Sequence, residues 1–241
     1  RSGSSQLYRL PLDSGGEPAC LTSQSGGITG AALSPDGRLI LYTARVLVDS
    51  QEVFTDKPGA APRARIFDTL FYRHWDAWRN GAYSHLFIAP AEPGAQALDL
   101  TPGKVDCPPA ALGSRKDFAV SPDNRHVYYA ANRDEVVARS TNNDLWRVGL
   151  DGKGLERVTS NPANDNTVLF SPKGKVLAYR AMKRAGFESD KHDIWLLDTS
   201  TGRRVCLTGE FDRSAEELAW DPKGETLYFT AESEGRVSIF S

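Results

Sequence analysis

The sequence is poor in the features that mark several large protein classes. Its three cysteines, Cys20, Cys107 and Cys206, are too few for a disulfide framework and lack the paired spacing of a zinc site. No apolar run approaches the roughly 18 residues of a membrane helix, and the first residues lack a signal-peptide pattern. Lysine and arginine (29) nearly balance aspartate and glutamate (31). The composition therefore predicts a soluble chain whose partners include neither nucleic acid nor a membrane.

Motifs for catalysis and metal binding are also missing. The sequence has no G-x-S-x-G element, and no Ser, His and Asp set has the local context of a known nucleophile. Its four histidines have neither H-x-x-x-H spacing nor cysteine-rich surroundings: His74, His85, His126 and His192. We therefore expect no catalytic residues, no metal and no cofactor within this chain.

What the sequence does contain is an internal repeat. Four segments share an apolar strand, a turn of proline with glycine or asparagine, and a second strand rich in β-branched and aromatic residues. They are ALSPDGRLILYTA from Ala32, AVSPDNRHVYYAA from Ala119, LFSPKGKVLAYRA from Leu169 and AWDPKGETLYFTA from Ala219. Their prolines lie 87, 50 and 50 residues apart, and a period near 50 indicates a repeat array.

Between these segments lies a second hairpin, which ends in a threonine within ACLT, LDLT, RVT or VCLT. One repeat is therefore four antiparallel strands. Because such a sheet cannot bury both faces alone, neighbouring sheets must stack. We predict an all-β fold, a β-propeller of four-stranded antiparallel blades, with a long β-sandwich as the alternative.

The strand count predicts an incomplete propeller. The chain should begin with the last two strands of one blade, contain three full blades and end after three strands of another. We interpret residues 1–241 as a partial propeller domain cut from a longer one; closure into a four-bladed ring is the alternative. Incomplete blades would leave apolar faces and strand edges uncovered, which favours self-association of the fragment.

The long first interval points to an insertion at about 45–83. Its second half lies in FDTLFYRHWDAWRNGAYSHLF, residues 67–87, and follows a polar loop, DSQEVFTDKPGAAPRA. Apolar and aromatic side chains recur every four residues from Ile66 to Trp78, which predicts an amphipathic helix ending near Gly81. Such an insertion can carry a binding surface; the alternative is that its aromatics only cover the rim of the second blade.

A second, shorter segment is also longer than the repeat requires. It is MKRAGFESDKHD, residues 182–193, where a turn of two to five residues could join the strands. It places Phe187, Glu188 and Asp190 on an exposed loop beside Arg184. The alternative is a set of solvated charges, with Glu188 paired to Arg184.

The repeat resembles the propellers of TolB and of the prolyl oligopeptidase family of serine peptidases. The pairing of the RHWD-x-W block with the GFESD loop resembles the dipeptidyl-peptidase V group of that family, over essentially all 241 residues. The resemblance implies a periplasmic or secreted enzyme, in which a propeller of about seven blades caps an α/β-hydrolase domain with a Ser, Asp and His triad. No hydrolase domain is present here, so catalysis would belong to the parent protein.

The resemblance also implies a role for the two long segments, the insertion at about 45–83 and residues 182–193. In these peptidases the propeller screens substrates by size and recognises the free amino end of the peptide, and a buried ammonium group must be paired. We predict that Glu188 is the amine contact, with Asp190 second and Asp76 third, and that Phe187, Arg73 and Trp75 also line the substrate site. The expected partners are a peptide and the carboxy-terminal hydrolase domain. The alternative function is a TolB-like protein-binding propeller without a hydrolase.

Overall fold

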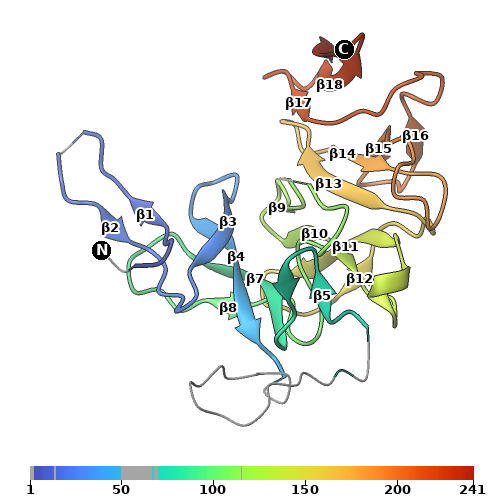
Figure 1. The fold of residues 1–241 in the computed structure, drawn as a ribbon. Helices are drawn as coiled ribbons and strands as arrows, with labels where there is room; N and C mark the ends of the chain where they lie inside the picture. Colours follow the sequence, from blue (N-terminus) through green and yellow to red (C-terminus); the bar gives the residue numbers. More distant parts are fainter. Residues whose placement is uncertain (1–2, 14, 50–66, 68–69, 115) are drawn as a thin grey trace.

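Five antiparallel sheets follow one another along the chain, as Figure 1 shows. The computed structural model describes residues 3–13, 15–49, 67, 70–114 and 116–241. Three four-stranded sheets lie between a two-stranded sheet and a three-stranded sheet, and a separate hairpin is formed by β5 and β6. Within the described residues there is no α-helix, only the short 3-10 helix η2 (Val137–Arg139). The prediction of an all-β fold of stacked four-stranded blades is confirmed, with two strands before the three full blades and three strands after them.

The strands are numbered in chain order. The first sheet is β1 (Tyr8–Arg9) and β2 (Ala19–Cys20), and the second is β3 (Ile28–Leu33), β4 (Leu39–Leu47), β7 (Ala82–Pro90) and β8 (Leu98–Asp99). The third is β9 (Phe118–Val120), β10 (His126–Asn132), β11 (Asn143–Gly149) and β12 (Glu156–Arg157). The fourth is β13 (Asp165–Phe170), β14 (Val176–Ala181), β15 (Asp193–Asp198) and β16 (Arg204–Cys206). The fifth is β17 (Leu218–Trp220), β18 (Leu227–Ser233) and β19 (Arg236–Phe240).

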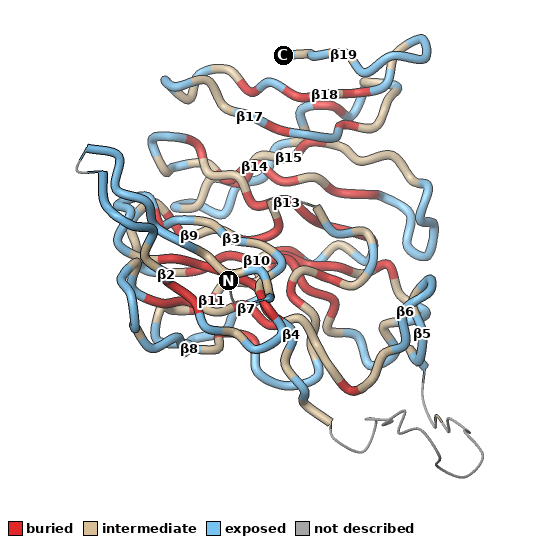
Figure 2. Tube along the Cα trace, turned by 60° about the vertical axis from the view of Figure 1, so that its left-hand side comes forward, coloured by how far each residue is buried: buried red, intermediate tan, exposed pale blue. Residues whose placement is uncertain are grey.

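The core lies between the sheets rather than inside any one of them. Strand β10 shows why: Tyr129 packs with Leu41 of the second sheet, and its neighbour Tyr128 packs with Leu177 of the fourth. Alternate side chains of a strand point to opposite faces, so both faces need cover. Burying each such side chain stabilises the fold by roughly 1.5–3 kcal/mol. Figure 2 accordingly shows burial along the strands and exposure in the connections.

The proline turns lie at one edge of the stack, by which we mean the side where the first and second strands of each sheet are joined. In the first turn the N–H of Gly37 donates to the carbonyl of Ser34 over 2.9 Å, and Asp36 Oδ1 accepts from Ser34 Oγ at 2.6 Å. Successive turns also approach closely. A Cβ placed on Gly174 (φ 75°) would lie 2.7 Å from Cβ of Pro122, so that position requires glycine for both its backbone conformation and its contact.

The threonine that ends each outer hairpin holds two strands together. In the three four-stranded sheets its hydroxyl oxygen accepts from a backbone N–H within the third strand, and Thr22 accepts from the residue that directly precedes β1. The pairs are Thr22 with Leu7, Thr101 with Leu86 and Thr159 with Leu145, each at 2.9 Å, and Thr208 with Ile194 at 2.8 Å. The repeated threonine is therefore a structural element that replaces a ladder hydrogen bond where the outer strand ends.

The prediction of a helix in the aromatic block is wrong for the part that the structure describes. Residues 70–81 form a hairpin of β5 (Arg73–His74) and β6 (Ala77–Trp78), with Trp75 at φ 48° in its turn. The rings stack across the hairpin, with centroids of Tyr72 and Trp78 6.2 Å apart. Aromatic side chains favour strands, and this cross-strand pairing overrides the four-residue spacing. The predicted polar loop before the hairpin lies almost entirely outside the described residues.

Candidate functional site

The predicted site residues lie at the edge opposite the proline turns. In an antiparallel meander, successive links between strands lie alternately at the two ends of the strands. The link from the second to the third strand therefore lies on the same edge of the stack as the connector that leads from one sheet to the next. This edge carries the insertion between β4 and β7, the 133–142 loop between β10 and β11, and the 182–192 loop between β14 and β15. The two predicted segments therefore share an edge, but the third sheet separates the sheets from which they arise.

In the 182–192 loop, Asp190 closes a turn. Its Oδ2 accepts from the backbone N–H groups of Lys183 and Arg184 at 2.8 and 2.7 Å, and its Oδ1 accepts from Arg184 Nε at 2.9 Å. Burial alone would raise the pKa of Asp190, but these hydrogen bonds lower it to about 2. Asp190 is thus ionised and already paired within its own loop.

The tip of the same loop presents a different carboxylate. Glu188 is exposed, and the hydrogen bonds and ion pairs found among the described residues do not include it. The alternative pairing of Glu188 with Arg184 is not formed, because Arg184 pairs with Asp190 and its guanidinium lies 4.0 Å from the ring centroid of Phe187. Phe187 remains 43% exposed. An unpaired carboxylate therefore stands next to an accessible aromatic ring.

The loop is fixed to the neighbouring sheet. The N–H of Gly186 donates to Thr141 Oγ1 at 2.9 Å, which connects the 182–192 loop to the 133–142 loop. The latter is itself bound together around Asp134, which accepts from Ser140 Oγ and Asn142 Nδ2 at 2.5 and 3.0 Å. Sequence reasoning missed this support, although the ten residues between β10 and β11 also exceed a tight turn.

The hairpin of the insertion has an anchored base and an exposed tip. At its base Arg79 pairs with Asp106 of the following connector at 2.6 Å, and its guanidinium lies 4.1 Å from the ring centroid of Tyr83. At its tip Trp75 is 85% exposed. Arg73 and Asp76 are also exposed. The hydrogen bonds and ion pairs of the described residues do not connect residues 73–76 with the 182–192 loop, so the structure shows two separate groups of candidate side chains.

Two histidines have structural contacts. Both ring nitrogens of His85 face acceptors, Asp99 Oδ2 at 2.7 Å and the carbonyl of Gly103 at 2.8 Å. Burial by itself would lower the pKa of His85, but these contacts raise it. Burial lowers the pKa of His192 to about 4, and its Nε2 contacts Asn164. Within the described ranges no three His, Cys, Asp or Glu side chains are grouped to hold a metal, and no helix there is long and apolar enough to cross a bilayer.

Comparison with known proteins agrees with this architecture. The family model described as "Dipeptidyl peptidase IV (DPP IV) N-terminal region" matches residues 69–185. Dipeptidyl-peptidase 5 of Porphyromonas gingivalis is 30% identical over 223 residues, which are 89% of this chain and 32% of that protein. Dipeptidyl-peptidase 5 of Aspergillus fumigatus is 27% identical over 244 residues, 91% of this chain and 34% of that protein. The chain thus spans about a third of the length of these relatives.

Solved structures show the same fold at lower identity. Acylaminoacyl peptidase of Pyrococcus horikoshii superposes with a TM-score of 0.67 at 13% identity, over 97% of this chain and 33% of that one. TolB of Acinetobacter baumannii superposes with a TM-score of 0.56 at 15% identity, over 94% of this chain and 44% of that one. The chain therefore shares the β-propeller fold of these structures and is similar in sequence to dipeptidyl-peptidase 5 and to the N-terminal region of dipeptidyl peptidase IV.

Proposed function

We propose that this chain is the part of a serine dipeptidyl peptidase that gates and recognises peptide substrates, and that the catalytic α/β-hydrolase domain lies elsewhere in the parent protein. The observation that carries the proposal is Glu188, a carboxylate without a partner in the described structure, held on a braced loop beside Phe187. Because the chain is similar to dipeptidyl peptidases, the ligand we propose for Glu188 is the free amino end of a peptide.

In this proposal each candidate residue has a distinct task. Glu188 pairs with the peptide ammonium and Phe187 packs a substrate side chain. Asp190 shapes the loop, since its oxygens are already occupied. Arg73, Trp75 and Asp76, at the tip of the insertion, gate the entrance.

The proposed partners and location rest on the family resemblance. The substrate is a peptide, the hydrolase domain packs on the edge that carries the long loops, and the parent is periplasmic or secreted. The chain alone should also self-associate through the outer face of the fifth sheet, where Val237 is 66% and Ile239 75% exposed. Sedimentation velocity would show this as a concentration-dependent dimer, and a monomer at all concentrations would refute it.

The test of the amine contact is Glu188→Gln in the full-length protein. The variant keeps the side-chain shape and loses the charge. A hydrogen-bonded ion pair in a shielded cavity contributes about 2–4 kcal/mol, so kcat/KM for dipeptidyl substrates with a free amino end should fall roughly thirty- to a thousand-fold. Substrates with a blocked amino end should hardly change. Small and equal effects on both substrates would show that Glu188 does not contact the amine.

A further inference from the structure

A cavity of about 630 Å³ lies against one face of the fourth sheet, beneath the connector that leaves the third. Its walls include the aromatic side chains of Tyr179 and Trp195, and Lys183 and Glu210 also line it. Arg204, another wall residue, donates from Nη2 to the carbonyl of Val158 at 2.5 Å and so joins the two sheets at the cavity. A volume of this size suits a small molecule.

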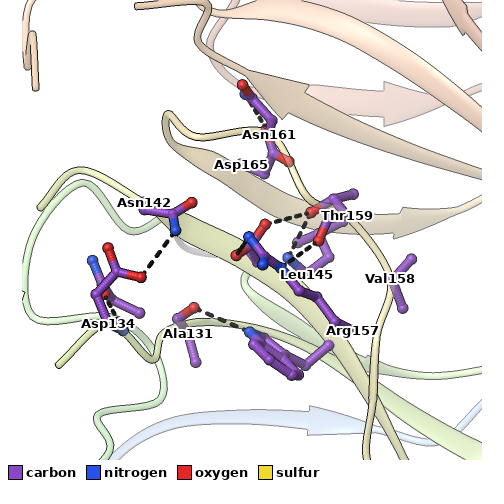
Figure 3. A network of polar contacts seen from close by, with 12 residues as sticks. Ala131, Asp134, Asn142, Leu145, Arg157, Val158, Thr159, Asn161 and Asp165 are labelled. Atoms are coloured by element: carbon purple, nitrogen blue, oxygen red, sulfur yellow. Dashed lines mark hydrogen bonds and ion pairs between the residues drawn. The ribbon is translucent and has the colours of Figure 1, made fainter. Parts of the chain in front are cut away.

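Asp165, at the start of β13, forms part of the wall and is only 1% exposed. Its Oδ1 accepts from Asn161 Nδ2 at 2.9 Å. Its Oδ2 is buried and has no hydrogen-bond partner among the described residues. In Figure 3 this second oxygen carries no dashed line and points away from Asn161. A buried carboxylate oxygen without a donor is costly, so it marks a place where a donor is missing.

Two other buried aspartates, and a half-buried one in the cavity wall, differ from Asp165 in this respect. Asp144 pairs with Arg157 Nη2 at 2.6 Å. Asp117 accepts from the backbone N–H groups of Ser114 and Thr167 and from the Ser114 hydroxyl. Asp193, the other aspartate of the cavity wall, pairs with Lys191 at 2.8 Å.

The cation that acts on Asp165 does not fill this gap. The guanidinium of Arg204 favours the ionised form of Asp165 electrostatically but forms no ion pair with it. Burial, with the charge of Asp144 adding to it, raises the pKa of Asp165 to about 7, while the side chains of Asn161 and Thr159 act in the opposite direction. Asp165 is therefore a carboxylate that needs either a proton or an external cation with N–H donors.

The chemistry of the cavity selects among cations. A metal ion usually needs several protein ligands, and the described residues contain no group of three. An ammonium group needs only hydrogen-bond acceptors and one counter-charge, and aromatic walls attract both a cation and a short aliphatic chain. We infer that this cavity binds a small primary alkylamine, whose ammonium group pairs with Asp165 and whose apolar part lies against Tyr179 and Trp195. The inference does not depend on the proposed peptidase function.

The experiment measures the affinity of isopentylamine for the 241-residue chain by ligand-observed NMR and calorimetry. Isopentanol, which has the same shape and no charge, is the ligand control. Asp165→Asn is the test variant, because it is isosteric and removes only the charge. Glu210→Gln is the matched control variant, since it removes an exposed carboxylate from the same cavity wall. Circular dichroism establishes that both variants are folded.

We expect saturable binding of isopentylamine by the wild type and at least about tenfold weaker binding by Asp165→Asn, which corresponds to about 1.4 kcal/mol. Glu210→Gln should stay close to the wild type, and isopentanol should bind at least about tenfold more weakly than the amine. Absence of saturable amine binding, or equal affinity of the wild type and Asp165→Asn, would overturn the inference. So would a crystal structure grown with isopentylamine in which Oδ2 of Asp165 contacts only a water molecule.

Discussion

The two edges of the stacked sheets use carboxylates in different ways. At the edge of the proline turns, Asp36 and Asp123 each accept from a serine hydroxyl and from a backbone N–H of their own turn. These hydrogen bonds lower the pKa of both aspartates. At or near the opposite edge, Glu188 and the buried Asp165 have oxygens without partners in the described structure. The second edge also has paired carboxylates, such as Asp190 and Asp134, but it differs from the first in carrying these two oxygen groups without partners.

The largest effect that we predict from this comparison is the pH dependence of stability caused by Asp165. Its pKa is about 7 in the folded chain and 3.8 in the reference state, so the folded state binds the proton more tightly. Folding is therefore favoured as pH falls from 8 to 5, where Asp165 is protonated only when folded. The contribution is roughly 2–3 kcal/mol. Asp165→Asn should remove this gain and should exceed the wild type in stability at pH 8.

Urea unfolding at pH 5 and pH 8 measures the effect. Asp144, paired with Arg157, also has a raised pKa, about 6, and contributes with the same sign in both proteins. Because the charge of Asp144 also raises the pKa of Asp165, the difference between the two proteins reports Asp165 together with its coupling to Asp144. If Asp165→Asn and the wild type show the same pH dependence, Asp165 is satisfied in solution and the contrast between the two edges fails at this residue.

The second prediction tests the edge of the proline turns. Gly174→Ala should destabilise the chain by about 2–3 kcal/mol, because alanine is strained at φ 75° and its Cβ would overlap Pro122 of the preceding turn. Gly37→Ala is the matched control, with φ 69° and no atom within 4 Å of the added Cβ. It should cost only about 1 kcal/mol in chemical unfolding experiments. Equal losses would mean that contact between successive turns contributes nothing to stability.

The sequence predicts the regular edge better than the functional one. Proline, glycine and alternating apolar residues act locally, so the strands of each sheet and the four turns can be read from ALSPDGRLILYTA and its copies. For residues 70–81 the four-residue spacing predicts a helix, whereas the chain forms a hairpin. Ring stacking such as Tyr72 on Trp78 depends on a chain reversal at Trp75 that periodicity does not reveal.

Partner choice was even less predictable at the candidate site. Glu188 and Asp190 are two residues apart in one loop, yet only Asp190 meets the N–H groups of Lys183 and Arg184. That difference depends on the path of the loop, which a one-dimensional pattern does not specify. For Asp165 the sequence offers one signal, a charged residue at the start of a strand, DNTVLF, whose second half is apolar. Its missing partner follows from the packing of the third sheet on the fourth.

The smallest effect separates a positioning role from a binding role in the 182–192 loop. In Asp190→Asn the amide places an N–H donor where Lys183 and Arg184 need an acceptor, so the turn should open and Glu188 should be displaced. In the full-length protein we expect KM for substrates with a free amino end to rise about tenfold with kcat little changed, or about 1.4 kcal/mol of binding. Blocked substrates should be unaffected, and exposed Ser189→Ala should behave like the wild type. An equal loss on blocked substrates would mean that Asp190 supports the fold of the sheet edge rather than the amine contact.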